Sequence, residues 1–171
     1  MMGKMHSLMM GAALAVASVT TPVHAQMRHR SPDPAGMAAV QRFQLDTTFL
    51  HRAEAVTRAA RALKHPPHID ARKAHTLDAL AAELDADAGT HAILAHHHLS
   101  AKRYLAGSFA LANAAMAAAM QAQLGDRMPA EARAHINARN VAFYKAHKAE
   151  VDHLLHLNMQ AARQQAAASG Q

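Results

Sequence analysis

Apolar residues recur at helical spacing along most of the chain. Over residues 37–63 they return at steps of three and four, the period of one face of a helix. The proline pair within residues 64–68 stops this pattern, because proline cannot continue a helix. Asp70 is placed to cap the next helix, whose apolar stripe ends at Gly89, and Thr90 is placed to cap a short segment after it.

The second half of the chain predicts two longer helices. Ser100 is placed to cap the first of them, and Gly125 is placed to end it. Its predicted inward stripe consists of Leu105, Phe109, Ala112, Met116 and Met120. The opposite face is mostly alanine and glycine, which lets a neighbouring helix approach closely. Pro129 suits the first turn of a short helix, and Asn137 is placed to cap the last long helix, which carries a broad apolar face.

These patterns predict an all-α fold, with one domain over residues 37–159 and about four principal helices in an up-and-down bundle or a close variant of it. The composition agrees, because 44 of the 171 residues are alanine, the best helix former, and only 4% are aromatic. Residues 26–36 hold two prolines and a glycine without apolar periodicity, which predicts a flexible tether. Residues 160–171 contain no large apolar residue and are predicted to fray.

The first 25 residues have the three-part pattern of a secretory signal peptide. Lys4 provides the positive charge, residues 8–19 form an uncharged apolar run, and Val23 and Ala25 are small enough for signal peptidase. The apolar run is shorter than a transmembrane helix, which disfavours the alternative of an uncleaved anchor, and no cysteine is present to carry a lipid. We therefore expect cleavage after Ala25 and export to a bacterial periplasm. The mature chain has no second apolar run of membrane length, so no transmembrane segment is predicted in it.

Composition and charge exclude several classes of function. Without cysteine, the chain has no disulfide, no cysteine zinc ligand, no covalent c-type haem and no cysteine nucleophile. The net charge of +6 becomes +5 without Lys4, and the basic residues are scattered along helix faces, which disfavours a nucleic-acid partner. No G-x-S-x-G motif surrounds Ser108, and no glycine-rich phosphate loop is present, so no enzymatic activity is predicted.

Histidine is the unusual chemical resource of this chain, with 15 residues. Glu150, His153 and His156 follow each other at steps of three on one predicted helix, and such a face is able to bind copper, zinc or nickel. The alternative is a solvated helix face, because the 13 histidines after residue 25 produce such spacings by chance. The chain lacks the paired Glu-x-x-His motifs of a di-iron bundle and the His-Glu-x-x-His signature of zinc proteases. No pattern specifies a cofactor.

The histidines as a set predict a further alternative, an acid response. If the 13 histidines of the mature chain titrate near their reference value of about 6.5, the charge rises from +5 toward +18 in acid. Self-repulsion then loosens a marginal bundle and exposes its apolar faces, as an acid-activated periplasmic chaperone requires.

Two stretches of the second half share a pattern with known proteins. One is residues 99–105 (LSAKRYL) with the alanine-rich helix that follows, and the other is residues 140–150 (NVAFYKAHKAE). Together they resemble a group of uncharacterised exported helical proteins of Gram-negative bacteria, over about the last 80 residues. The resemblance implies export and an all-helical fold and carries no known activity. His98 stands where this group leads us to expect a glycine, and Asn140 and Phe143 are predicted to be structural.

The sequence therefore predicts an exported helical protein without catalytic activity, which binds a partner or has a protective role. The first alternative is a periplasmic metal-binding protein with Glu150, His153 and His156 as ligands. The further alternative is the acid-responsive chaperone. The sequence does not decide whether the bound partner is a protein or a metal ion.

Overall fold

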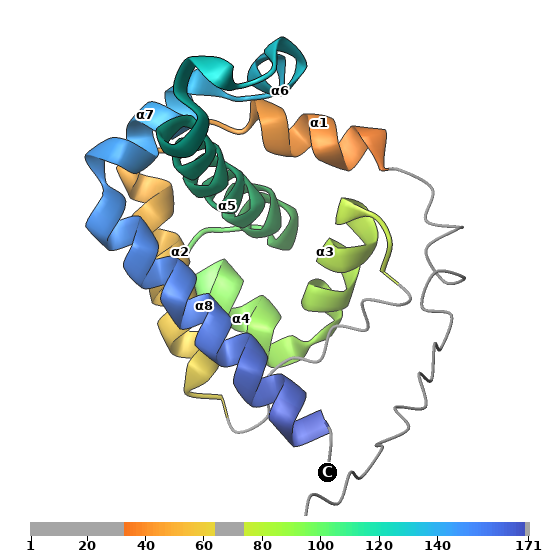
Figure 1. Ribbon diagram of the computed structural model, residues 1–171. Coiled ribbons are helices and arrows are strands. Elements are labelled where there is room, and N and C mark those ends of the chain that lie inside the picture. The colour runs from red at the N-terminus through yellow and green to blue at the C-terminus, as the bar shows by residue number, and fades with distance from the viewer. Residues whose placement is uncertain (1–32, 64–73, 170–171) are drawn as a thin grey trace, which may run out of the picture. The chain divides into compact units, whose positions relative to one another are not determined.

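The computed structural model describes residues 33–63 and 74–169. Within these residues the chain forms helices and no strand, which confirms the all-α prediction (Figure 1). The elements are α1 (Pro34–Arg42), α2 (Thr47–Arg61), α3 (Leu77–Ala86), α4 (Ala88–His96), α5 (Ala101–Leu124), the 3₁₀ turn η2 (Gly125–Arg127), α6 (Ala130–Ala134), α7 (Ala138–Ala146) and α8 (Lys148–Ser169). The predicted signal peptide, the first part of the predicted tether, the proline pair and Asp70 lie outside the described residues.

Helix α5 is the centre of the fold. It packs against α1, α2, α3, α4 and α7, while α8 packs against α2 and α7 (Figure 1). The largest side chains that these helices bury almost completely are Phe49, Leu50, Leu94, Leu111, Val151 and Leu154. Two of the four predicted helices are each divided in two, as α1 with α2 and as α7 with α8.

The division between α1 and α2 is fixed by polar groups that the apolar spacing does not reveal. The buried side chain of Asn140 donates its Nδ2–H to the Phe43 carbonyl at 2.8 Å and accepts the Leu45 N–H at 3.1 Å. Asp46 then caps α2 by accepting the Phe49 N–H at 2.6 Å. These side chains satisfy backbone groups that an uninterrupted helix would pair internally, so one long helix over 37–63 does not form. The prediction that Asn140 is structural is confirmed.

Aspartates begin two helices at positions that differ from the prediction. Helix α1 starts at Pro34, within the segment predicted as a tether, because the Asp33 carboxylate accepts the Gly36 N–H at 2.9 Å and proline suits a first turn. Helix α4 starts after Asp87, whose carboxylate accepts the Thr90 N–H at 2.7 Å. Thr90 is therefore the capped residue and not the cap, because the short carboxylate of Asp87 reaches the free N–H groups of the first turn.

Three other helix ends are confirmed. Ser100 accepts the Arg103 N–H at 3.2 Å at the start of α5, and Asn137 accepts the Asn140 N–H at 3.2 Å at the start of α7. Helix α5 ends at Gly125, whose φ of +52° is a conformation that favours glycine.

Two boundaries extend further than predicted. Gly89 lies within α4 and does not end a helix. Helix α8 continues to Ser169, through most of the segment predicted to fray. That segment is dominated by alanine and glutamine, which favour the helix even without large apolar residues.

The face of α5 that enters the core is its alanine face. Its buried residues are Ala101, Leu105, Ala106, Gly107, Ala110, Leu111, Ala114, Ala117 and Ala118. Phe109 is 43% exposed and Met116 is 60% exposed, so the prediction that both point inward is wrong. The small residues let α2 approach so closely that a Cβ atom on Gly107 would lie 2.1 Å from Cζ of Phe49. Close packing of the small face therefore outweighs burial of the larger side chains.

Helix α5 is also apolar enough to meet the criterion for a membrane-spanning helix. The segment Ala101–Arg127 contains an 18-residue window with a mean hydropathy of 1.2, and 44% of that window is buried in the fold. Core helices of water-soluble proteins meet the same criterion, and α5 is the helix around which the others pack. The rest of this apolar window lies nearer the surface, where a partner can reach it.

Candidate functional site

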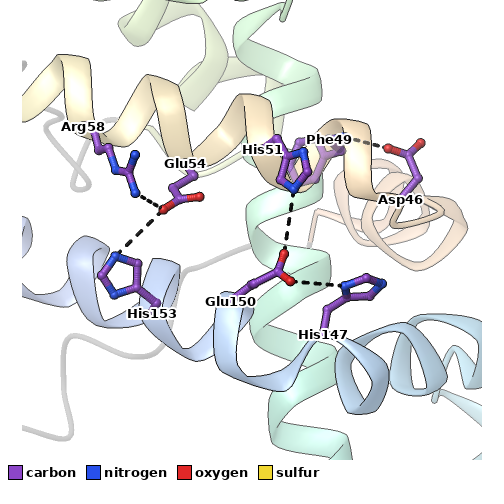
Figure 2. A network of polar contacts seen from close by, with 8 residues as sticks. All are labelled: Asp46, Phe49, His51, Glu54, Arg58, His147, Glu150 and His153. Carbon is purple, nitrogen blue, oxygen red and sulfur yellow. Dashed lines mark hydrogen bonds and ion pairs between the residues drawn. The ribbon is translucent and has the colours of Figure 1, made fainter.

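Histidines and glutamates of α2 and α8 meet in a line that we call the histidine seam (Figure 2). His51 Nε2 lies 3.8 Å from Glu150 Oε2, and His153 Nε2 lies 3.8 Å from Glu54 Oε1. The residues of α2 and those of α8 pair in the same order along the chain, so the two helices run parallel here. Arg58 also contacts Glu54, at 2.5 Å, which gives this carboxylate a permanent cation as a neighbour.

The structure gives the three predicted metal ligands different partners. Glu150 contacts His51 through one oxygen and His147 through the other, at 3.8 and 3.7 Å. His153 faces Glu54, whereas His156 lies one turn further on, with its Nε2 2.8 Å from Nε2 of Gln160. Across residues 33–63 and 74–169, no group of three histidine, aspartate or glutamate side chains is arranged to hold one metal ion. The seam thus contains Glu150 and His153 in separate pairs with residues of α2, and the metal site stays a prediction.

A buried polar network continues from the seam into the core. The Thr57 hydroxyl donates to Asn158 Oδ1 at 3.0 Å and lies 3.2 Å from the Tyr104 hydroxyl. Because Thr57 has one hydroxyl proton, the Tyr104 O–H donates to Thr57. Burial raises the pKa of Tyr104, and its hydrogen bonds with Thr57 and Ser108 oppose this rise. The network therefore joins α2, α5 and α8 as a neutral structural contact.

The start of α8 is tied to α7 by a second polar group. Tyr144 donates its hydroxyl proton to Asp152 at 2.8 Å, and the Lys148 ammonium also contacts Asp152. The hydrogen bond from Lys148 lowers the pKa of Asp152 and raises that of Lys148. Asp152 is therefore an ionised acceptor that holds the bend between the two helices.

Two adjoining cavities lie along α5. The first, of about 240 Å³, lies between α1, α5 and the segment from α6 to α7, and the second, of about 370 Å³, lies between α1, α3 and α5. Val40, Gln41 and Asn113 line both cavities, so together they form one depression, which we call the α5 groove. The α5 residues that line it are Phe109, Ala110, Asn113, Ala114, Met116, Ala117 and Met120.

The exposed face of α5 that borders this groove is uncharged. From Tyr104 to Leu124 the helix contains no acidic, basic or histidine residue. Phe109 and Met116 nevertheless reach the surface, and Met37 of α1, 54% exposed, stands beside the second cavity. Depletion of charge together with exposed large apolar side chains is typical of the centre of an interface. The α5 groove therefore differs from an ordinary solvated helix face.

Three titratable side chains line the groove, and one of them is fully engaged. Asp33 accepts the Gly36 N–H through one oxygen at 2.9 Å and the Leu77 N–H through the other at 2.7 Å. These two backbone hydrogen bonds lower the pKa of Asp33. The other two are His75 in the second cavity and His135 in the first. No lysine or arginine lines either cavity.

The spacing of apolar residues does not predict the α5 groove, because it assigns Phe109 and Met116 to the core. A different signal in the same helix could have identified it. A helix that lacks a polar face needs cover on all sides, and residues 104–124 have no charged position. The sequence therefore indicates that α5 has more apolar surface than a core face needs, but it does not indicate which elements lie beside that surface.

A scan against known protein families and searches of curated proteins and of solved structures found no match to this chain. The resemblance to exported helical proteins stays a prediction.

Proposed function

We propose that this chain is an exported binding protein without catalytic activity, and that its working surface is the α5 groove. The observation that carries the proposal is the uncharged face of α5, where Phe109 and Met116 stay outside the core beside two adjoining cavities. Apolar surface gains roughly 25 cal/mol per Å² when it leaves water, so this exposed surface favours a bound partner. Concave apolar sites with a few polar groups are the usual binding sites of proteins.

The methionines of the groove support a binding role that tolerates ligands of different shape. Met37, Met116 and Met120 line the two cavities. Methionine is unbranched and its thioether is polarisable, so it adapts to partners that a rigid branched side chain would exclude. We therefore propose broad apolar specificity for this surface.

Two observations support a role without catalysis. The sequence offers no motif that activates a nucleophile around Ser108. The one carboxylate of the groove, Asp33, already accepts two backbone N–H groups, and that engagement suits a helix cap better than a proton carrier.

Binding of a neutral apolar dye, Nile red, tests the proposed surface. We expect the purified protein to bind the dye saturably and Met116→Lys to weaken this binding by about tenfold, because the ammonium places a charge in an apolar groove. Met159→Lys is the matched control, since Met159 is 53% exposed on α8 and does not line the groove. Circular dichroism melts check that both variants remain folded. An equal loss of dye binding in both variants, or no saturable binding, contradicts the proposal.

Export is the part of the proposal that rests on residues 1–25. We expect protein recovered from the periplasm of an expression host to have the mass of a chain that begins at Gln26. Replacement of Ala25 by leucine should leave the leader attached, because signal peptidase requires a small residue there. A full-length chain that stays in the cytoplasm contradicts export.

A further inference from the structure

The α5 groove contains two free amide side chains at the place where its cavities join. Gln41 of α1 and Asn113 of α5 line both cavities, and both residues are exposed. Neither side-chain amide has a hydrogen-bond partner among the residues that the structure describes. An amide both donates and accepts hydrogen bonds, which matches the C=O and N–H groups of a peptide backbone.

The charge of the groove selects against ionised ligands. Its one carboxylate, Asp33, is occupied by two backbone N–H groups. The walls beside it are apolar, and they include Leu77 and Leu80 of α3 and Ile136 near α7. A basic side chain would meet only Asp33, whose oxygens already accept two backbone N–H groups, and an acidic one would meet His75 and His135 but no lysine or arginine. The complementary ligand is therefore uncharged.

The size of the groove suits a short extended segment. Cavities of about 240 and 370 Å³ each exceed the roughly 150 Å³ that is enough to hold a benzene ring, so each accommodates a large apolar side chain. The stretch of α5 from Phe109 to Met120 measures about 17 Å at 1.5 Å per residue. An extended chain covers that length with about five residues.

We propose, building on the function proposed above, that the α5 groove binds an extended, uncharged polypeptide segment of another protein. The segment places large apolar side chains in the two cavities. Its backbone forms hydrogen bonds with the side-chain amides of Gln41 and Asn113.

The test uses a dansyl-labelled heptapeptide of leucine, valine and serine with blocked ends, and fluorescence anisotropy measures its binding to the purified protein. We expect methylation of its central peptide nitrogens to weaken binding about fivefold, because each lost hydrogen bond removes a modest net contribution. Replacement of its leucines by aspartate should weaken binding at least about tenfold, because the groove disfavours charge.

Protein variants separate backbone recognition from apolar burial. Asn113→Leu should weaken peptide binding about fivefold although leucine adds apolar surface to the groove, because the substitution removes the amide. Asn113→Ala is a second variant with the same expected loss of peptide binding. Gln123→Leu is the matched control, since Gln123 is an exposed α5 amide that does not line the groove.

The outcomes distinguish this inference from the proposed function. If Nile red binds and the peptide does not, the polypeptide inference is overturned and the apolar binding role stands. If neither Nile red nor the peptide binds, both the polypeptide inference and the proposed binding role are contradicted. If N-methylation or Asn113→Leu has no effect, backbone recognition is overturned. A wild-type dimer in sedimentation that Met116→Lys converts to a monomer would overturn the inference in favour of a second copy in the groove.

Discussion

Gly107 sets the distance between α5 and α2. A Cβ atom at this position would lie 2.1 Å from Cζ of Phe49, whose ring is buried and in edge contact with Phe43 at 4.9 Å between centroids. We expect Gly107→Ala to lower the free energy of unfolding in urea by about 1–3 kcal/mol, because the ring has no free space to move into.

Gly89 is the matched control for this prediction. It lies in α4, and a Cβ atom there would meet its nearest neighbours at 3.5 Å, which is ordinary contact. Gly89→Ala should therefore raise stability by about 0.5–1 kcal/mol, through the lower flexibility of the unfolded chain. Equal effects of the two substitutions would contradict the close approach of α2 to α5.

His98 holds a backbone conformation that favours glycine, with φ of +55°. It follows α4 in the hydrogen-bond pattern of a Schellman motif, in which Leu99 N–H donates to the Leu94 carbonyl at 2.9 Å and His98 N–H donates to that of Ala95 at 3.0 Å. We expect His98→Gly to raise the free energy of unfolding by about 1 kcal/mol, since it relieves the left-handed strain. His96→Gly, in the last turn of α4, should lower it by up to about 1 kcal/mol. A loss of stability in His98→Gly would show that the imidazole itself is needed.

Asp33 couples the start of α1 to pH. Two backbone hydrogen bonds, from Leu77 and Gly36, lower the pKa of this carboxyl in the folded state. Such a group stabilises the fold fully above its ordinary pKa of about 4, and this stabilisation is lost as pH falls through the lower folded value. Asp33→Ala should therefore lower Tm by a few degrees at pH 7, and the difference from wild type should shrink below about pH 4. A difference that does not change with pH would exclude the ionised carboxylate as its source.

At the scale of helices, the sequence predicts helical content and many ends, but it does not predict which surfaces meet. Ser100 and Asn137 act on N–H groups three residues away, so a local pattern reveals them. The break before α2 depends on Asn140, whose partner Leu45 lies 95 residues earlier in the chain. Which face of α5 points inward depends on how closely α2 approaches. Apolar spacing predicts that Phe109 is buried in preference to alanine, because it contains no information on that distance.

The histidine seam leads to a prediction about metal binding. Glu150, His153 and His156 are held by different partners, and the partner of His153, Glu54, also pairs with Arg58. A metal ion would have to break these contacts and compete with a neighbouring guanidinium. We therefore expect Tm with copper, zinc or nickel to stay within about 1 °C of its value with EDTA. A rise of several degrees that disappears in a His153→Ala, His156→Ala double variant would establish the metal site that the sequence predicts.

At the scale of the whole molecule, the alanine-rich core and the apolar groove have one cause. Helix α5 has small residues on one side and Phe109 and Met116 on another, and the small side enters the core. The small side lets α2 approach closely at Gly107, and the larger side chains of α5 remain exposed beside the two cavities. The helix that supports the fold is thus also the helix that presents the proposed binding surface.

Acid should loosen this molecule, and salt should oppose the loosening. Residues 26–171 carry a net charge of +5 and contain 13 histidines, which add positive charge when they are protonated. His51, His91, His147 and His153 lie within 3.3–3.8 Å of carboxylates, but each pair has at least one exposed partner and is worth less than about 1 kcal/mol. Each new positive charge is also repelled by all the other positive charges on the surface, and salt screens this repulsion. We therefore expect Tm by circular dichroism to fall between pH 7.5 and pH 5 in low salt, and about 0.5 M NaCl to restore part of it. Nile red binding should rise in the same interval if the fold opens around α5. If salt instead lowers Tm at pH 5, the local pairs dominate, and the acid-responsive alternative loses its physical basis.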